Sequence, residues 1–310
     1  MENIKNISII GAGLMGCGIA QIFASCKDIN VSIFDSFLSK KQVFERINTN
    51  MKLLEEKSVI EKSDIRNALN RISVFNNLSE AVKNSDFILE CIPENMEKKQ
   101  NLFREIELLC EKDTIFATNT SVMSITEISK KMVNKKRIVG THFWNPPYLI
   151  PLVEVIRSDD TSDEVFENTF KLMKRINKKP IKVNKDVPGF VANRLQHALW
   201  REAISIVENE IADAKTVDEA IKMSFGLRLP VLGPLENSDM VGTDLTLSIH
   251  EYIFKYIESS KEASYVLREK VKNKDLGFKT GKGFYSWNEE QMNKSKRDLI
   301  EHLIKVVYKK

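Results

Sequence analysis

The chain of 310 residues lacks the patterns that build disulfide frameworks, metal sites and membrane anchors. Its four cysteines form no C-x-x-C pair and sit in apolar segments, as small buried side chains do in a reducing compartment. No apolar run approaches the ~20 residues of a membrane-spanning helix. The first residues enter a predicted strand almost at once, so neither a signal peptide nor a transit peptide fits. We expect a soluble, cytoplasmic protein that binds no metal.

A strong charge of either sign is also missing. The 47 basic residues nearly balance the 43 acidic ones, and the basic residues are scattered rather than gathered in a stripe. This argues against a nucleic-acid partner, whereas the small net charge of +4 suits an anionic small molecule. The length and the hydrophobic share of 42% are those of a soluble chain with two domains.

Short β-rich runs alternate with amphipathic stretches through the first part of the chain, which predicts a wound, largely parallel α/β sheet. The predicted strands are Ile7–Ile10, Val31–Asp35, Ile72–Phe75, Asp86–Glu90, Thr114–Thr118, Ile138–His142, Leu152–Ile156 and Ile181–Val183. Residues 39–70 carry apolar residues at helical spacing, so we expect a helix pair that projects from the sheet. The pair is either a solvated excursion or a cover for a bound ligand.

After Lys185 the strand signals stop and the periodicity becomes helical. An apolar stripe follows Phe190, made of Val191, Leu195, Leu199, Ile206 and Val207. We therefore predict two domains, with the wound sheet in residues 1–185 and an all-α domain in residues 186–310.

The first predicted strand runs directly into a G-x-G-x-x-G loop that opens a helix, the arrangement that binds a dinucleotide pyrophosphate at a helix N-terminus. The residues that we expect to contact the cofactor there are Gly11, Gly13, Leu14, Met15 and Gly16. Asp35 follows about 20 residues later, where a carboxylate binds the ribose hydroxyls and repels a 2′-phosphate, so the pattern favours NAD over NADP. The alternative is a glycine-rich turn without a ligand.

His142 ends one predicted strand, and Glu154 lies inside the next, beyond a loop stiffened by prolines. The two side chains can meet across this loop, and an imidazole held by a carboxylate is a general acid/base unit. The other three histidines lie in helical stretches away from strand ends. The alternative is a structural histidine beside a proline-rich loop.

Asn119, Thr120 and Ser121 follow another predicted strand, at the edge of the sheet where ligands bind in open α/β folds. The Ser121 hydroxyl is suited to hydrogen-bond a reacting substrate oxygen. The alternative is that Ser121 caps a helix over residues 122–128.

Several motifs, taken together and in this order, resemble the L-3-hydroxyacyl-CoA dehydrogenase family over roughly residues 5–287. They are the glycine loop 11–16, Asn119–Ser121, His142–Pro147, Pro151–Glu154, Pro188–Arg194 and Lys279–Tyr285. The resemblance implies a Rossmann-like NAD-binding domain and a helical domain that binds substrate and builds a homodimer. It also implies the interconversion of (S)-3-hydroxyacyl-CoA and 3-oxoacyl-CoA in fatty acid metabolism.

The resemblance also assigns roles to individual residues. His142 corresponds to the catalytic base, Glu154 to its partner and Asn145 to a residue that supports the pair. Ser121 and Asn193 correspond to residues that hold the substrate oxygen. The residues that correspond to cofactor contacts beyond the glycine loop are Glu94 and Lys99, near the nicotinamide ribose, and Asn119.

Two departures from the family pattern bear on the substrate. The helical domain reads Phe225 to Glu236 where relatives carry a different segment, and Arg228 there offers a guanidinium to a substrate carboxylate. Its alternative role is a surface or interface salt bridge. The second departure is a basic tail, residues 288–310, whose Leu299, Leu303 and Val306 predict a docking helix.

The sequence thus predicts an NAD-dependent dehydrogenase that acts on a short-chain substrate such as 3-hydroxybutyryl-CoA. One alternative is a relative that oxidises a carboxylated alcohol without CoA, such as a 3-hydroxy acid. A more distant alternative is an inactive NAD-binding protein with a structural or regulatory role.

Overall fold

The protein is described by a computed structural model that covers residues 4–308. Its contacts group the chain into two compact units, residues 1–193 with 298–310 and residues 194–297. This division differs from the predicted boundary at residue 185 in two ways. Phe190 is buried in the core of the first unit, which keeps the turn after the last strand there. The end of the tail also belongs to the first unit, because Ile304 packs against Leu54.

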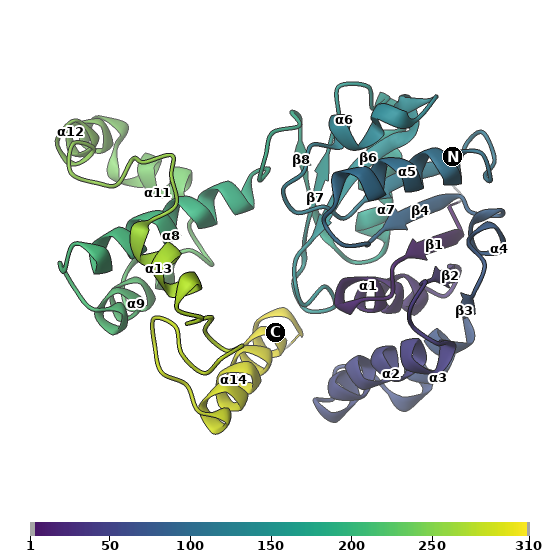
Figure 1. The fold of residues 1–310 in the computed structure, drawn as a ribbon, viewed down its shortest axis with the longest axis horizontal. Coiled ribbons are helices and arrows are strands. Elements are labelled where there is room, and N and C mark those ends of the chain that lie inside the picture. Colours follow the sequence, from purple (N-terminus) through teal and green to yellow (C-terminus); the bar gives the residue numbers. More distant parts are fainter. Residues whose placement is uncertain (1–3, 309–310) are drawn as a thin grey trace. The chain divides into compact units, whose positions relative to one another are not determined.

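The first unit is built on one eight-stranded sheet, with the strand order β3-β2-β1-β4-β5-β6-β7-β8 (Figure 1). Its strands are β1 Asn6–Ile10, β2 Asn30–Phe34, β3 Ile72–Phe75, β4 Phe87–Glu90, β5 Ile115–Thr118, β6 Ile138–Phe143, β7 Leu152–Ile156 and β8 Lys179–Val183. Neighbouring strands are parallel except β6 and β7, which are antiparallel. The wound, largely parallel α/β sheet predicted from the sequence is confirmed. The order reverses between β1 and β4, which is where ligands bind in folds of this kind.

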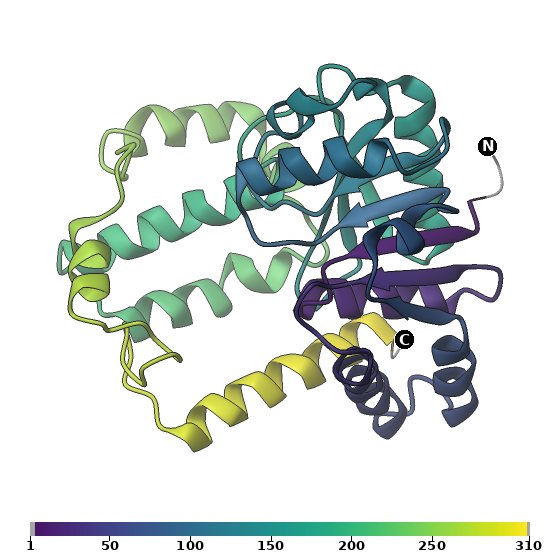
Figure 2. The same ribbon diagram turned by 45° about the vertical axis from the view of Figure 1, so that its right-hand side comes forward.

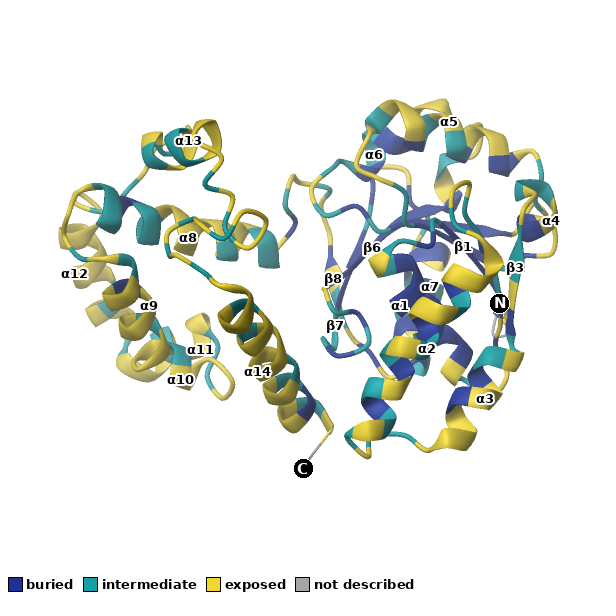
Figure 3. Ribbon diagram, turned by 60° about the horizontal axis from the view of Figure 1, so that its bottom comes forward, coloured by how far each residue is buried: buried dark blue, intermediate teal, exposed yellow. Residues whose placement is uncertain are grey.

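Helices cover both faces of this sheet because side chains alternate along each strand. On β4, Phe87 and Leu89 join one core cluster and Ile88 joins the other. The helices of this unit are α1 Leu14–Ser25, α2 Lys40–Glu56, α3 Lys62–Asn70, α4 Leu78–Val82, α5 Met96–Glu107, α6 Ile125–Ile128 and α7 Asp163–Arg175. Short 3-10 turns lie at Ser129–Lys131 and Lys135–Arg137. In Figure 3 the middle of the sheet is dark blue, the colour of buried residues, whereas the edge strands β3 and β8 are partly teal or yellow.

Helices α2 and α3 form the expected helix pair. Ser39 caps α2, where it and Gln42 exchange hydrogen bonds. Its buried face consists of Val43, Ile47, Met51 and Leu54. The C-terminal end of α14, Glu289–Tyr308, lies beside α2 (Figure 2, yellow and purple). Lys57 Nζ and Glu301 Oε1 form an ion pair there at 2.7 Å.

The tail therefore forms a helix that docks, as predicted, and Leu303 lies on its docking face as expected, but the other two predicted residues do not. Leu299 and Val306 are exposed, whereas Ile300, Leu303 and Ile304 pack against the first unit. The helical stripe that docks is thus rotated by about one residue from the expected stripe, since residues three and four apart share a helix face.

The second unit is all-α, as predicted. Its helices are α8 Ala192–Glu208, which enters it from the first unit, α9 Ala214–Lys222, α10 Phe225–Arg228, α11 Pro234–Val241, α12 Thr243–Ile253, α13 Tyr265–Lys272 and the start of α14. Within residues 194–297, all of which the structure describes, only Ser205 and Val217 are buried. The apolar stripe of α8 is accordingly exposed at Leu195 and Leu199. Among residues 4–308, no helix is both long and apolar enough to cross a membrane.

Candidate active site

The glycine loop joins β1 to α1 at the point where the strand order reverses. Gly11 has a φ of +99°, and a Cβ there would lie 2.7 Å from the Cys91 carbonyl oxygen. A Cβ on Gly16 would lie 1.8 Å from the Gly11 oxygen. At Gly13, by contrast, a Cβ would meet no described atom within 4 Å. Two glycines are therefore required by the fold, whereas Gly13 leaves open space above the N-terminus of α1, as a cofactor pyrophosphate requires.

Asp35 follows β2 directly and faces the same loop. Its Oδ2 accepts a hydrogen bond from the Ala12 amide at 2.7 Å, and its Oδ1 accepts from the amides of Phe37 and Leu38. These bonds fix the carboxylate beside the glycine loop. The loop and the acid thus have the arrangement that the sequence predicts for a dinucleotide site, and they fit the cofactor.

A buried cluster of charges lies at the ends of the adjacent strands β4 and β5. Lys99 Nζ is 2.6 Å from Glu90 Oε1 and 3.3 Å from Glu94 Oε2, and both Lys99 and Glu90 are fully buried. The Thr118 hydroxyl and the Ile92 amide also donate to Glu90. Burial raises the pKa of the Glu90 carboxyl despite the adjacent Lys99 ammonium. Glu94 and Lys99 were expected from the sequence, whereas Glu90 was not. The signal for Glu90 is a carboxylate that ends an apolar strand.

Glu94 connects this cluster to Ser121. Its Oε1 accepts a hydrogen bond from the Ser121 amide at 2.7 Å, and both of its carboxylate oxygens accept from the Thr120 hydroxyl. Asn193 Nδ2 in turn donates to the Ser121 carbonyl oxygen at 3.0 Å. The structure therefore brings Glu94, Lys99, Ser121 and Asn193 together.

Ser121 does not cap a helix. The following helix, α6, starts at Ile125, and its cap is Ser124, whose hydroxyl accepts from the Glu127 amide. The Ser121 hydroxyl itself has no hydrogen-bond partner within the part of the chain that the structure describes. It is therefore available to a ligand.

His142 and Glu154 are direct partners in the antiparallel register of β6 and β7. His142 Nδ1 lies 2.7 Å from Glu154 Oε2, and both residues are buried. A carboxylate only accepts hydrogen bonds, so Nδ1 carries the proton and Nε2 of the neutral ring is left as an acceptor. Phe190 and Trp144 flank the imidazole, with ring centroids 5.7 and 5.4 Å away.

The Glu154 carboxylate is held in its ionised form. Burial raises its pKa, but hydrogen bonds from His142 and from the amides of Ala192 and Val191 outweigh burial, so the pKa lies below its ordinary value of 4.5. The two amides donate to Oε1 at 3.0 and 2.9 Å. Such a carboxylate is suited to stabilise an imidazolium.

The support that Asn145 is expected to give this pair stays a prediction. The residue is exposed, and no hydrogen bond within residues 4–308 joins its side chain to His142 or Glu154. The supporting contacts come from the Trp144 Nε1, 3.4 Å from Glu154 Oε2, and from the two backbone amides. Asn119 has a role that the sequence did not suggest, because its Oδ1 accepts from the Phe143 amide at 2.9 Å and fixes the end of β6.

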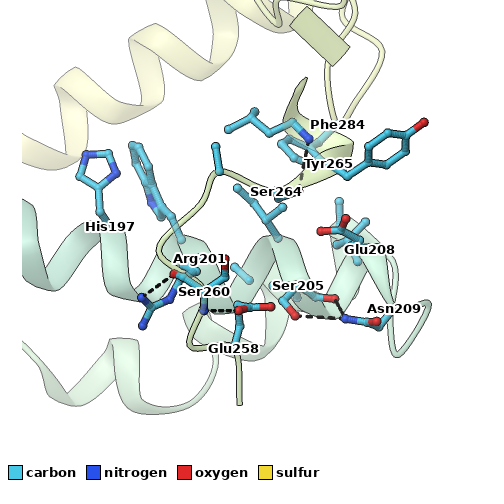
Figure 4. A pocket seen from close by; sticks show the side chains of 18 of the residues that line it. His197, Arg201, Ser205, Glu208, Asn209, Glu258, Ser260, Ser264, Tyr265 and Phe284 are labelled. Carbon is cyan, nitrogen blue, oxygen red and sulfur yellow. Dashed lines mark hydrogen bonds between the residues drawn. The ribbon is translucent and has the colours of Figure 1, made fainter. Parts of the chain in front are cut away.

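Arg228 lies in the second unit, at the end of the short helix α10, and it is exposed. No carboxylate within residues 4–308 forms an ion pair with it, so a salt bridge of Arg228 at an interface stays a prediction. The second unit also holds a cavity of about 1410 Å³, lined by α8, α9 and residues 258–267 (Figure 4). Its lining includes His197, Trp200 and Tyr265 but none of the predicted site residues.

A Rossmann-like sheet with a dinucleotide loop, a buried His–Glu pair and a following helical unit defines a two-domain NAD-dependent dehydrogenase. Family models agree with this class. The 3-hydroxyacyl-CoA dehydrogenase NAD binding domain matches residues 6–187, and the 3-hydroxyacyl-CoA dehydrogenase C-terminal domain matches residues 189–287. The chain belongs to the 3-hydroxyacyl-CoA dehydrogenase family.

Individual relatives differ in how much of the chain they match. A probable 3-hydroxybutyryl-CoA dehydrogenase of Bacillus subtilis is 36% identical and covers 93% of this chain and 99% of its own. The structure of (S)-3-hydroxybutyryl-CoA dehydrogenase from Ralstonia eutropha has a TM-score of 0.77 at 32% identity, over 92% of this chain and 100% of that one. The structure of 5-formyl-3-hydroxy-2-methylpyridine 4-carboxylic acid 5-dehydrogenase, described as an NAD+ dependent dismutase, has a TM-score of 0.89 at 29% identity, over 98% and 97%.

Proposed function

We propose that this protein interconverts (S)-3-hydroxyacyl-CoA and 3-oxoacyl-CoA, with short-chain substrates such as 3-hydroxybutyryl-CoA. The observation that carries the proposal is the buried His142–Glu154 contact of 2.7 Å at the end of β6. In oxidation, Nε2 of His142 takes the proton of the substrate hydroxyl, and Glu154 stabilises the imidazolium that results. In reduction, the imidazolium returns the proton to the oxygen.

The substrate oxygen is held by Ser121 and Asn193 in this proposal. Their mutual contact of 3.0 Å and the free Ser121 hydroxyl support it. The cofactor would be held by the glycine loop with Leu14 and Met15, by Asp35, and by Glu94, Lys99 and Asn119. When bound, NAD supplies the acceptor for the hydride that leaves the substrate carbon, or the donor in the reverse direction.

Replacement of the base tests the proposal. We expect His142→Gln to lower turnover of acetoacetyl-CoA by about a thousandfold or more, since both the base and its hydrogen bond to Glu154 are lost. NADH affinity should stay the same, because the glycine loop is separate from His142. Wild-type turnover in this variant, with His197→Gln as the matched control on an exposed histidine, would contradict the assignment.

A second candidate is dehydrogenation of a small carboxylated substrate without CoA. The observation in its favour is the higher TM-score and coverage of the pyridine carboxylic acid dehydrogenase, whose match extends over almost the whole chain. Arg228, exposed and free of any carboxylate within residues 4–308, is then the residue that binds the substrate carboxylate.

A substrate panel separates the two candidates. Acetoacetyl-CoA and longer 3-oxoacyl-CoA thioesters are compared with the free 3-oxo acids and with pyridine carboxylates, each followed by NADH absorbance. Activity confined to thioesters supports the first candidate. Activity confined to free acids, lost in Arg228→Met and kept in the control Lys222→Met, supports the second.

The helical unit further suggests a homodimer. Only two of residues 194–297 are buried, and large apolar side chains such as Leu227, Leu245 and Phe254 are exposed. A unit of this size needs an apolar interior to remain folded, and a second copy supplies the missing contacts. Sedimentation at several protein concentrations tests this, and a monomer at every concentration would refute it. We also propose a cytoplasmic location.

A further inference from the structure

The loop between β6 and β7, residues 144–151, presents more backbone acceptors than donors. Pro146, Pro147 and Pro151 have no N–H group. Two of its carbonyl oxygens accept backbone hydrogen bonds from residues that the structure describes. That of Pro146 accepts from the amides of Leu149 and Ile150 at 3.0 and 2.9 Å, and that of Pro151 accepts from the Lys179 amide at 2.8 Å. Buried carbonyl groups without partners are costly, so the remaining ones need donors from outside the loop.

Lys178 provides two of these donors. Its ammonium donates to the carbonyl oxygens of Pro147 and Ile150, the second at 2.8 Å. The residue is 8% exposed, and burial lowers the pKa of its ammonium to about 8. No carboxylate within residues 4–308 pairs with it, so the loop carbonyls are the groups that compensate its charge.

Tyr308, near the end of α14, provides a third donor. Its hydroxyl donates to the Tyr148 carbonyl oxygen at 2.7 Å. Four residues earlier on the same helix, Ile304 is buried in a cluster with Leu149. The end of α14 thus covers the loop with a segment that lies beyond residue 287, where the family match ends.

This loop joins the two members of the acid/base pair. It begins directly after β6, which carries His142, and leads into β7, which carries Glu154. Trp144 in the loop contacts both, through its Nε1 near Glu154 and its ring beside the imidazole. A displacement of the loop therefore changes the surroundings of both catalytic side chains.

We propose that Lys178 and Tyr308 are positioning residues that hold the loop 144–151 so that Trp144 and Glu154 keep His142 in its reactive orientation. The proposal rests on the acid/base role of His142 given above. A buried lysine and the C-terminal helix thereby affect turnover, although neither contacts the reacting atoms.

Kinetics of three lysine variants test the first residue. Lys178→Met removes the donors at nearly constant volume, and we expect kcat to fall about ten- to a hundredfold with NADH affinity unchanged, as small displacements of catalytic groups do. Lys178→Arg keeps donors and charge and should restore most of the lost turnover. Lys179→Met, at the exposed neighbouring position, is the matched control and should match wild type. Wild-type kcat in Lys178→Met, or a fall that Lys178→Arg does not restore, would overturn the proposal for Lys178.

The tyrosine is tested in the same assay. Tyr308→Phe removes one hydrogen bond, and we expect kcat to fall about fivefold. Val306→Ala, at an exposed position on the same helix, should leave kcat unchanged. In the double variant with Lys178→Met the effects should not add, because both residues act through one loop. Full additivity would overturn the shared action.

Hydrogen exchange separates this proposal from the proposed function. The amides of Leu149 and Ile150 should exchange faster in Lys178→Met and in Tyr308→Phe than in wild type, whatever the substrate is. Unchanged exchange refutes the loop contacts even if activity falls. Faster exchange together with wild-type turnover in His142→Gln refutes the proposed catalytic pair instead. The proposed effect of the loop on turnover is then refuted as well.

Discussion

The Glu154 carboxylate is the point where the structure makes the sharpest prediction. Four donors converge on its two oxygens: His142 Nδ1 and Trp144 Nε1 on Oε2, and the amides of Val191 and Ala192 on Oε1. In Glu154→Gln one oxygen becomes an amino group, which is a donor. Whichever way the amide is oriented, it points a donor at donors, and the negative charge is gone.

The magnitude follows from this geometry. If the amide oxygen keeps the two backbone N–H groups, the amino group faces His142 and forces Nδ1 to accept. Nε2 then carries the proton and no longer acts as a base, so we expect kcat to fall about a thousand- to ten-thousandfold. Loss of a buried charge-assisted contact should lower the free energy of unfolding by about 2 kcal/mol.

The pH dependence has a definite sign. Because the pKa of Glu154 is lower in the folded protein than its ordinary value of 4.5, its stabilisation is fully present above that value and is lost as the pH falls through the folded-state pKa. The stability difference between wild type and Glu154→Gln should therefore shrink in acid.

Turnover followed by NADH absorbance and urea unfolding at several pH values measure both effects. Glu167→Gln, on the exposed side of α7, is the control. A Glu154→Gln variant with wild-type kcat would refute the reasoning, and so would a stability difference that grows as the pH falls.

Three further predictions concern the cofactor side of the site. Gly13→Ala should keep wild-type stability but bind NADH about tenfold or more weakly, and equal NADH affinity of this variant and wild type would contradict the prediction. Gly16→Ala should unfold at a lower urea concentration than wild type, because its Cβ would clash with the backbone. Lys99→Met leaves the Glu90 carboxylate buried without its partner, so we expect the free energy of unfolding in urea to fall by about 3–5 kcal/mol. Adding Glu90→Gln should restore much of this loss, and a double variant as unstable as Lys99→Met would show that the unpaired charge is not the cause. Asp35→Asn should raise the ratio of NADPH to NADH turnover, and an unchanged ratio would remove Asp35 from cofactor choice.

Much of the fold follows from local patterns in the sequence. All eight strands lie within two residues of their predicted bounds, because β-branched runs between turns are a strong signal in a sheet that is buried on both faces. The buried face of α2 consists of apolar residues at the helical spacing that predicted a helix pair in residues 39–70. The meeting of His142 and Glu154 was likewise predictable, since a stiff loop between two strands brings their ends together.

What the sequence did not reveal depends on contacts between distant residues. In the sequence, Glu90 does not differ from other charged residues at strand ends. Only the structure shows that Lys99, nine residues further along, is buried against it. Asn145 was assigned to the pair by its place in a motif, and within residues 4–308 it is exposed and forms no hydrogen bond to either partner. The docking face of α14 was partly mistaken because Leu299 and Ile300 have similar hydrophobicity, and only the packing against Leu54 distinguishes them.

The scarcity of buried residues in the helical unit has a consequence for how the protein behaves on dilution. If a second copy of the chain covers its apolar side chains, as proposed, folding of the helical unit is coupled to dimerisation. Its melting midpoint should then rise with protein concentration, while that of the sheet unit stays constant. At low concentration the helical unit would loosen first, and turnover per molecule would fall although His142 and Glu154 remain in contact. Its catalytic capacity would then depend on the amount of protein as well as on its chemistry.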